Sequence, residues 1–416
     1  SELDEIWQNT LLNQFHDILP GSSINWVYKD ANSMSKKNLD KLDKLEKKLL
    51  IKLHGNSTKN ADKFVVYNSQ PWKRKEVIRL AADDGQYWVG DGTSSQIMQA
   101  KNGVIDYQIE LPPCGYNCIY IEGVEMNYPH KEILLKASKK LLENKFIKVD
   151  LTDDGTISSI YDKLEKREVL AGKANEFLLW EDEPNNWGAW DVNHFYRETT
   201  PQKAKLISSK IIHQSDISAT LAQKFKIGNS TIEQKITISE NSKLIKFENV
   251  VDWKEEHKML RVSAQPDIYA SKASYEIQYG TLQRATHSNT SWDAAKFEVT
   301  AQRFADISLP DYGFAILNDC KYGHYIKENV MSLNLLRSPK DTDKEADQHS
   351  HKFTFCYYPH KGSLIESDTL QLAHNLNSPL MKFPVSELPE NRQRSFYNIL
   401  GKNVKLEVIK KAEDRN

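Results

Sequence analysis

The sequence predicts a mainly β protein whose chain begins with two helices, and two periodicities carry this prediction. Over the first 55 residues, apolar side chains recur at steps of three and four, as on one face of an amphipathic helix. From Phe64 onward they occur in short β-type runs separated by glycine, asparagine and aspartate turns, which is typical of antiparallel strands. Since no repeat of fixed period occurs, a solenoid or a propeller is excluded.

The two helices are expected to form a hairpin over residues 1–56. The first helix ends at Pro20-Gly21, after which Ser22 or Ser23 is placed to cap the second helix. The apolar stripe of the first helix consists of Leu3, Ile6, Trp7, Leu11 and Phe15, and that of the second of Leu39, Leu42, Leu45, Leu49 and Leu53. Because two amphipathic helices cannot bury such stripes alone, the hairpin needs a partner.

Two β domains are expected to follow the hairpin. The first, over residues 57–125, is a small β-sandwich whose size suits an immunoglobulin-like fold, although counting strands leaves its topology open. The second, over residues 126–416, is a large antiparallel sandwich with long loops. The strand-like runs are 64–67, 76–80, 104–111, 146–151, 156–161, 231–238, 244–251 and 403–409.

Composition narrows the class of protein. With 416 residues the chain is long enough for two or three domains. Its 56 basic and 57 acidic residues give a net charge of −1, so no basic surface for nucleic acid is expected. No apolar run approaches the roughly 20 residues that a membrane helix needs. Four cysteines without a second metal-ligand pair fit a reducing compartment, so we expect a cytoplasmic protein.

The run LLNQFHDILPGSSI (residues 11–24) carries the strongest functional signal. By itself, the pair His16-Asp17 at the end of a helix is more often a capping or core pair than a metal site. The whole run, however, closely resembles the segment that carries a zinc-binding histidine in the family 38 glycoside hydrolases, the class II α-mannosidases. This resemblance implies that His16 is a zinc ligand.

Later segments resemble the cytosolic and bacterial branch of the same family. They are GTISSIYDK (155–163), WGAWDV (187–192), YEIQYG (275–280), THSNTSWDAA (286–295), LNDCKYG (317–323) and LLRSP (335–339). At Gly188 the chain departs from the family, whose members usually carry aspartate there. The resemblance implies that the hairpin is part of a three-helix bundle and that the large domain is a supersandwich resembling galactose mutarotase.

What the resemblance implies for chemistry is the retaining hydrolysis of terminal α-mannosides, with a mannose-containing oligosaccharide as substrate. In the family, a His-x-Asp pair, an aspartate nucleophile and the histidine corresponding to His16 hold one zinc ion, and a second carboxylic acid protonates the leaving group. A retaining mechanism places its two carboxyl groups about 5–5.5 Å apart. Zinc can hold the sugar ring distorted toward its transition state.

This chain contains no His-x-Asp element. None of its aspartates or glutamates lies in a sequence motif that matches the nucleophile or the acid of the family. We therefore expect a fragment that lacks the N-terminal α/β domain, is truncated at the C-terminal end of its large domain and contains no catalytic residue. We do not expect such a fragment to hold zinc tightly or to be active alone. Its unpartnered helical stripe favours association, either with the missing domain or in a homo-oligomer.

Four further residues are candidates for binding substrate. Asp17 either contacts the sugar or orients its neighbours. Trp190 and Asp191 follow a loop rich in glycine, asparagine and proline, so the indole faces either a sugar or the core. Arg337 offers a hydrogen-bonding fork to a sugar, although a structural salt bridge is the stronger alternative. His287, Asp293 and Asp319 are interpreted as structural.

A second hypothesis makes the chain a standalone β-sandwich module that binds carbohydrate or a protein partner without catalysis. The two hypotheses differ in what precedes Ser1 in the parent gene. An α/β domain with a His-x-Asp element supports the enzyme, and a start codon supports the module.

Overall fold

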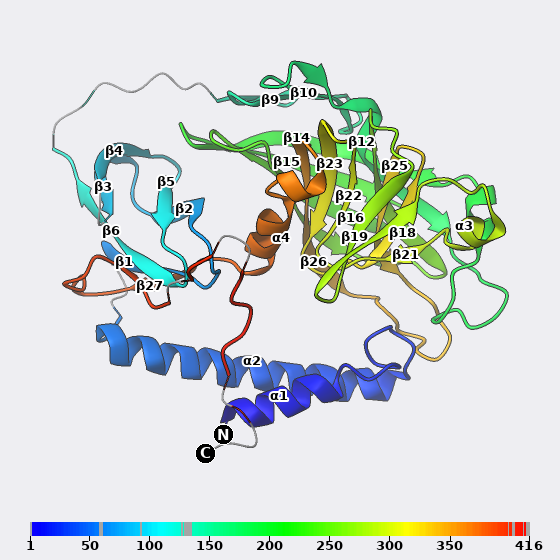
Figure 1. Ribbon diagram of the computed structural model, residues 1–416, viewed down its shortest axis with the longest axis horizontal. Helices are drawn as coiled ribbons and strands as arrows, with labels where there is room; N and C mark the ends of the chain where they lie inside the picture. Colours follow the sequence, from blue (N-terminus) through cyan, green and yellow to red (C-terminus); the bar gives the residue numbers. More distant parts are fainter. Residues whose placement is uncertain are drawn as a thin grey trace. The chain divides into compact units, whose positions relative to one another are not determined.

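The computed structural model describes residues 2–57, 61–91, 94–125, 128, 135–397, 399–401, 404–410 and 412. Contacts divide the chain into two units (Figure 1). The first unit comprises Ser1–Asp43 and Ile133–Asn377, and the second comprises Lys44–Glu132 and Ser378–Asn416. This division differs from the predicted boundaries, because each unit is built from two separate stretches of the chain. Among the described residues, no helix is long and apolar enough to span a membrane.

The predicted helical hairpin is present as α1 (Glu2–Leu12) and α2 (Asn25–His54). α1 ends at Leu12, earlier than the predicted end at Pro20-Gly21, and turns follow it. The amide of Asn9 donates to Asn38 at 3.2 Å, and Lys41 pairs with Glu5 at 2.8 Å, so polar contacts join the two helices. Ile6 is buried, whereas Leu3, Trp7, Leu11 and Phe15 are 46–63% exposed. We call these four residues the exposed stripe. The sequence-based expectation that the hairpin leaves apolar surface uncovered is confirmed.

The second unit is a small β domain with a six-stranded sheet and a separate two-stranded antiparallel sheet. Its core contains Leu50 of α2, Val65, Cys118 and Phe383. The six-stranded sheet consists of β1 (Lys63–Asn68), β3 (Gly85–Asp91), β4 (Ser95–Ala100), β6 (Gly115–Gly123), β27 (Met381–Pro384) and β28 (Gln393–Ser395). The two-stranded sheet consists of β2 (Arg74–Ala81) and β5 (Val104–Leu111).

Two of these strands come from the far end of the chain. β27 pairs antiparallel with β1, placing Pro384 opposite Phe64, and β28 pairs with β6. The segment after residue 378 therefore completes the small domain, whereas the sequence placed it in the large one. Residues 404–410 form no strand, so the strand predicted over 403–409 is absent from its described residues. Periodicity describes a local conformation and does not reveal which sheet a strand joins.

The first unit contains two large antiparallel sheets. The 11-stranded sheet consists of β7 (Lys136–Ser138), β8 (Leu141–Glu143), β9 (Ile147–Leu151), β10 (Ile157–Asp162), β11 (Arg167–Glu168), β12 (Leu170–Glu181), β13 (Gln202–Lys203), β18 (Lys258–Pro266), β21 (Val299–Thr300), β24 (Gly323–Lys327) and β25 (Val330–Arg337). The nine-stranded sheet consists of β14 (Lys205–Gln214), β15 (Ser218–Ile227), β16 (Ser230–Ser239), β17 (Ile245–Asp252), β19 (Lys272–Ile277), β20 (Gly280–Ala285), β22 (Phe304–Ser308), β23 (Tyr312–Asn318) and β26 (Ser350–Lys361).

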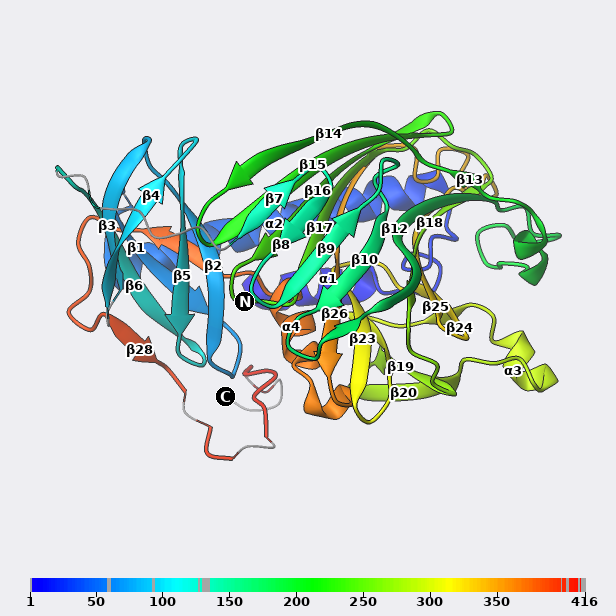
Figure 2. The same ribbon diagram turned by 90° about the horizontal axis from the view of Figure 1, so that it is seen from above.

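One continuous apolar core joins these two sheets. It takes Val149, Phe177 and Val262 from the first sheet, and Phe247 and Phe355 from the second. In Figure 2, β9 and β10 of the first sheet overlap β16 and β17 of the second. Short helices α3 (Ser291–Ala295) and α4 (Thr369–Asn377) and two 3₁₀ turns (His194–Glu198 and Leu364–Glu366) complete the unit. The predicted mainly β, antiparallel sandwich is confirmed.

Candidate functional site

His16 lies in the turn that joins α1 to α2, and its side chain is 69% exposed. The centroid of its ring is 4.3 Å from that of Phe15 and 6.4 Å from that of Trp190. Its Nε2 atom is 3.5 Å from the Oδ2 atom of Asp17. The turn and the loop that carries Trp190 therefore present an imidazole, a carboxylate and an indole together at the surface of the first unit.

Helix α2 holds the backbone of this turn in place. The Tyr28 hydroxyl donates to the carbonyl of Asp17 at 3.1 Å and accepts a hydrogen bond from the backbone N–H of Ser23 at 2.9 Å. Burial raises the pKa of Tyr28, so the hydroxyl keeps its proton and remains a donor. Gly21 has φ +88°, a left-handed conformation that favours glycine. The ring of His16 is thus exposed, while the backbone of its turn is held by hydrogen bonds to Tyr28 of α2.

The loop between β25 and β26 fastens the turn to the large sandwich. The Thr342 hydroxyl donates to the carbonyls of Ser22 and Ser23 at 3.1 and 2.9 Å. The amide of Asn25, the first residue of α2, donates to Asp343 at 3.0 Å and to Glu345 at 3.2 Å. The position of His16 is therefore set by residues more than 300 positions away, which sequence patterns do not reveal.

Arg337 organises the neighbouring loop, over residues 182–191. Its Nε and Nη2 atoms donate to the two carboxylate oxygens of Asp182 at 2.6 and 3.1 Å. Nη2 also donates to the carbonyls of Gly188 at 3.0 Å and Asp191 at 2.7 Å. Of the two alternatives for Arg337, the geometry favours the structural salt bridge. Contact of Arg337 with a sugar stays a prediction.

Trp190 lies in this loop and is 56% exposed, so its indole is a surface group beside His16. Asp191 is also exposed, and its carboxylate accepts the backbone N–H of Val192 at 2.8 Å. Asp17 faces both His16 and Ser22, whose hydroxyl is 3.4 Å from Oδ1 of Asp17. The structure thus brings His16, Asp17 and Trp190 together and places Arg337 behind the loop that carries Trp190 and Asp191.

The residues interpreted as structural have local partners. His287 is 3.7 Å from Asp293. At the start of α3, the carboxylate of Asp293 accepts a hydrogen bond from the Thr290 hydroxyl at 2.8 Å, and the backbone N–H of Asp293 donates to that hydroxyl at 3.1 Å. Asp319 accepts the backbone N–H of Thr354 at 2.9 Å.

Asp347, His349 and His351 form a cluster that the sequence reasoning missed. One ligand atom from each of the three residues lies within 4.8 Å of the other two. Burial lowers the pKa of His351 to about 4, so this imidazole is neutral near pH 7. The signal in the sequence is the pattern Asp-x-His-x-His at the start of a strand, where alternate side chains share a face.

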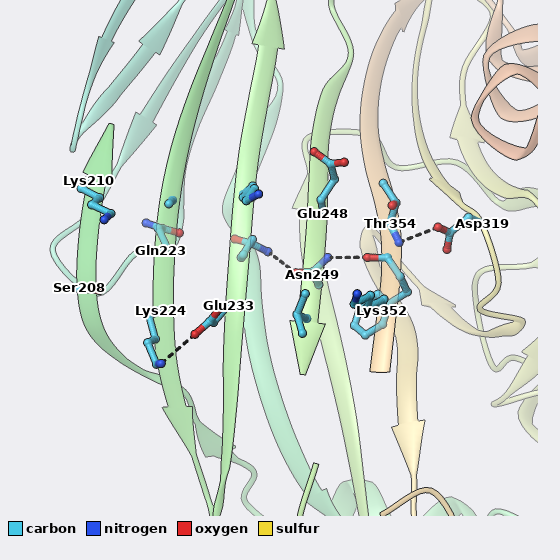
Figure 3. A pocket seen from close by; sticks show the side chains of 15 residues that line it. Ser208, Lys210, Gln223, Lys224, Glu233, Glu248, Asn249, Asp319, Lys352 and Thr354 are labelled. Atoms are coloured by element: carbon cyan, nitrogen blue, oxygen red, sulfur yellow. Dashed lines mark hydrogen bonds and ion pairs between the residues drawn. The ribbon is translucent and has the colours of Figure 1, made fainter. Parts of the chain in front are cut away.

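A separate hollow lies on the outer face of the nine-stranded sheet, and Figure 3 shows its lining. Lysines and glutamates line it, and Lys224 pairs with Glu233 at 2.8 Å. It contains none of the predicted site residues. Phe353 is the only aromatic residue among those that line it, so it offers little surface for stacking a sugar.

Comparisons with known proteins place two parts of the chain in described families. Residues 142–345 match the family described as "Glycosyl hydrolases family 38 C-terminal domain". Residues 1–53 match the "Alpha mannosidase middle domain". The two matched segments include His16, Asp17, Trp190, Asp191 and Arg337.

Relatives match over nearly the whole chain. Alpha-mannosidase 2C1 of Mus musculus is 32% identical over 99% of this chain, and the alpha-mannosidase of Saccharomyces cerevisiae is 34% identical over 99%. The chain spans only 39% and 36% of the lengths of these relatives. A solved alpha-mannosidase from Enterococcus faecalis V583 has a TM-score of 0.77 at 15% identity, covering 92% of this chain and 53% of its own, which establishes the fold alone.

Proposed function

Because this chain belongs to glycosyl hydrolase family 38, of which it carries the middle and C-terminal domains, we propose that it is part of a zinc-dependent retaining α-mannosidase. The whole enzyme hydrolyses terminal α-mannosides in mannose-containing oligosaccharides. This chain contributes one zinc ligand, His16, and part of the wall of the active site. The four cysteines are free, which supports a reducing, cytoplasmic location.

The observation that carries the proposal is the exposed imidazole of His16 beside the exposed indole of Trp190. An exposed histidine on a fixed backbone is free to bind a metal, and an indole offers an apolar face to a sugar ring. Asp17 is close enough to His16 to bind hydroxyl groups of the same sugar. Asp191 lies on the same loop as Trp190, and Arg337 holds that loop in place.

Zinc would act as a Lewis acid and orient the sugar. A catalytic zinc site needs about three protein ligands, and His16 supplies one of them. We place the other ligands, the nucleophile and the acid in the remainder of the parent protein. On this proposal the chain by itself does not hydrolyse mannosides, and His16 alone binds zinc weakly.

The test uses the full-length parent enzyme. His16→Ala should lower the zinc content of the parent by about one ion per chain and reduce kcat/KM on an aryl α-mannoside by at least about 100-fold, because a metal ligand matters more than the groups that orient it. His287→Ala is the matched control, since His287 is also exposed and close to an aspartate, Asp293. It should keep both zinc and activity.

Two further variants test the substrate side. Trp190→Ala should raise KM more than it lowers kcat if the indole packs on the sugar, and Asp17→Asn should lower kcat/KM with zinc retained. If His16→Ala keeps full zinc content and activity, the ligand assignment is wrong. A parent protein without mannosidase activity would favour the non-catalytic module.

A further inference from the structure

Asp347, His349 and His351 gather metal-ligating atoms where the loop after β25 enters β26. The three ligand atoms lie within 4.8 Å of one another, so small rotations of the side chains would bring all three to the distances of about 2.0–2.2 Å that zinc prefers. The two rings stack, with centroids 3.9 Å apart and an angle of 24° between their planes. Asp347 and His349 are exposed, so an ion could reach the cluster from solvent.

The hydrogen bonds of the two imidazoles support this interpretation. Nδ1 of His349 is 3.0 Å from the carbonyl of Ser350, and Nε2 of His351 is 2.7 Å from the carbonyl of Asp347. Since a carbonyl only accepts, each of these nitrogens carries its proton, which leaves Nε2 of His349 and Nδ1 of His351 with a lone pair. Metal-binding histidines commonly donate their other N–H to a carbonyl in this way.

We propose that Asp347, His349 and His351 form a binding site for a divalent transition-metal ion, with zinc as the best-matched ion. Two imidazoles and one carboxylate suit zinc, cobalt or nickel and are less suited to calcium or magnesium, which take oxygen ligands. Three protein ligands leave a further position for water. This proposal departs from the expectation that the isolated chain does not hold zinc tightly, because that expectation considered His16 as the only ligand in the chain. The site proposed here does not depend on His16 or on the proposed enzymatic function.

Three neighbouring charges act on the proposed site: Asp343 favours a cation, whereas Lys321 and Arg337 oppose one. Asp343 interacts electrostatically with Asp347 and adds negative charge, which favours a cation. Lys321, whose ammonium lies 4.7 Å from the centroid of the Phe353 ring, also interacts with Asp347 and opposes a cation. Removing the charge of Lys321 should therefore tighten metal binding. If the two histidines had only a structural role, this substitution would have no metal binding to change.

A metal here would stabilise the loop that positions His16. The ion would join Asp347 of the loop to the first residues of β26, and the same loop holds the His16 turn through Thr342 and Asp343. Metal binding should therefore slow hydrogen exchange over residues 338–349 and, through these contacts, over residues 13–23.

The experiment uses the 416-residue chain after treatment with a chelator and dialysis. Zinc is titrated against a chromophoric chelator, and cobalt is added separately to record its visible absorption bands. We expect one zinc ion per chain and cobalt bands of a site with nitrogen and oxygen ligands. His349→Ala, His351→Ala and Asp347→Asn should each weaken zinc binding at least about tenfold, and Lys321→Met should strengthen it.

Two controls separate this site from other histidines. His287→Ala and His16→Ala should bind zinc as tightly as the original chain does, which distinguishes the cluster from the site of the proposed enzyme. Circular dichroism of the metal-free variants checks that they fold. The proposal is overturned if the chain binds no zinc at micromolar concentration, if the three cluster variants bind as tightly as the original, or if only His16→Ala loses binding.

Discussion

Arg337 shows how a single side chain sets the geometry of the candidate site. Its guanidinium is largely buried and binds the buried carboxylate of Asp182 with two hydrogen bonds, while also holding two carbonyls of the Trp190 loop. A planar fork can make these contacts at once, and a lysine ammonium cannot. The orientation of the Trp190 loop therefore depends on Arg337 whether or not this residue touches substrate.

We predict that Arg337→Ala lowers the free energy of unfolding by about 3 kcal/mol, because the variant leaves the buried charge of Asp182 unpaired. Arg337→Lys should recover only part of this free energy, since lysine restores the positive charge but not the planar guanidinium that makes several hydrogen bonds at once. Urea denaturation measures the loss, and hydrogen exchange over residues 183–191 should become faster in both variants.

A matched surface pair serves as the control for Arg337. Lys246 and Glu248 are 3.1 Å apart and largely exposed, so Lys246→Ala should cost about 0.5 kcal/mol or less. Equal losses for Arg337→Ala and Lys246→Ala would contradict the role given to the Arg337–Asp182 pair.

At the scale of an element, helix α1 combines one buried residue with an exposed apolar stripe. Ile6 is 6% exposed, while the exposed stripe faces solvent within the first unit, with Leu3, Trp7 and Leu11 on α1 and Phe15 in the turn after it. An apolar face of this kind favours association with another protein surface. The acidic residues of its first turn, Glu2, Asp4 and Glu5, complement the helix dipole, so the helix itself is compatible with exposure.

We predict that the isolated chain self-associates through the exposed stripe. The double variant Trp7→Gln, Leu11→Gln should reduce association in sedimentation velocity and change the free energy of unfolding by less than about 0.5 kcal/mol, because both side chains are already exposed. Ile6→Ala is the contrasting variant and should destabilise the fold by about 2 kcal/mol. Association that persists unchanged in the double variant would place the contact elsewhere.

At the scale of the whole molecule, the two units have separate cores. Phe355 belongs to the core shared by the two large sheets, and Phe383 belongs to the core of the small domain. Helix α2 passes from one unit to the other, since the boundary falls between Asp43 and Lys44.

We predict two transitions in differential scanning calorimetry. Phe383→Ala should lower the midpoint of one transition and Phe355→Ala that of the other, each through a loss of about 3–5 kcal/mol from a buried aromatic side chain. A single transition that both variants shift equally would mean that the chain unfolds as one cooperative body.

By itself, the sequence determined the type of most elements and singled out His16 as a candidate zinc ligand. The helical stripe and the strands over 64–67, 104–111 and 231–238 follow from local periodicity, because a helix or strand facing a core must repeat its apolar residues with its own period. His16 was recognised from a contiguous run, so no tertiary information was needed to single it out.

Only the tertiary structure decided which distant segments meet. It joined β27 to β1, placed Trp190 beside His16, and gave Arg337 its partner Asp182. It also brought Asp347, His349 and His351 into one cluster. Pairing between strands and contacts between loops depend on the packing of the whole chain, and residues that are far apart in sequence leave no local pattern that records their meeting.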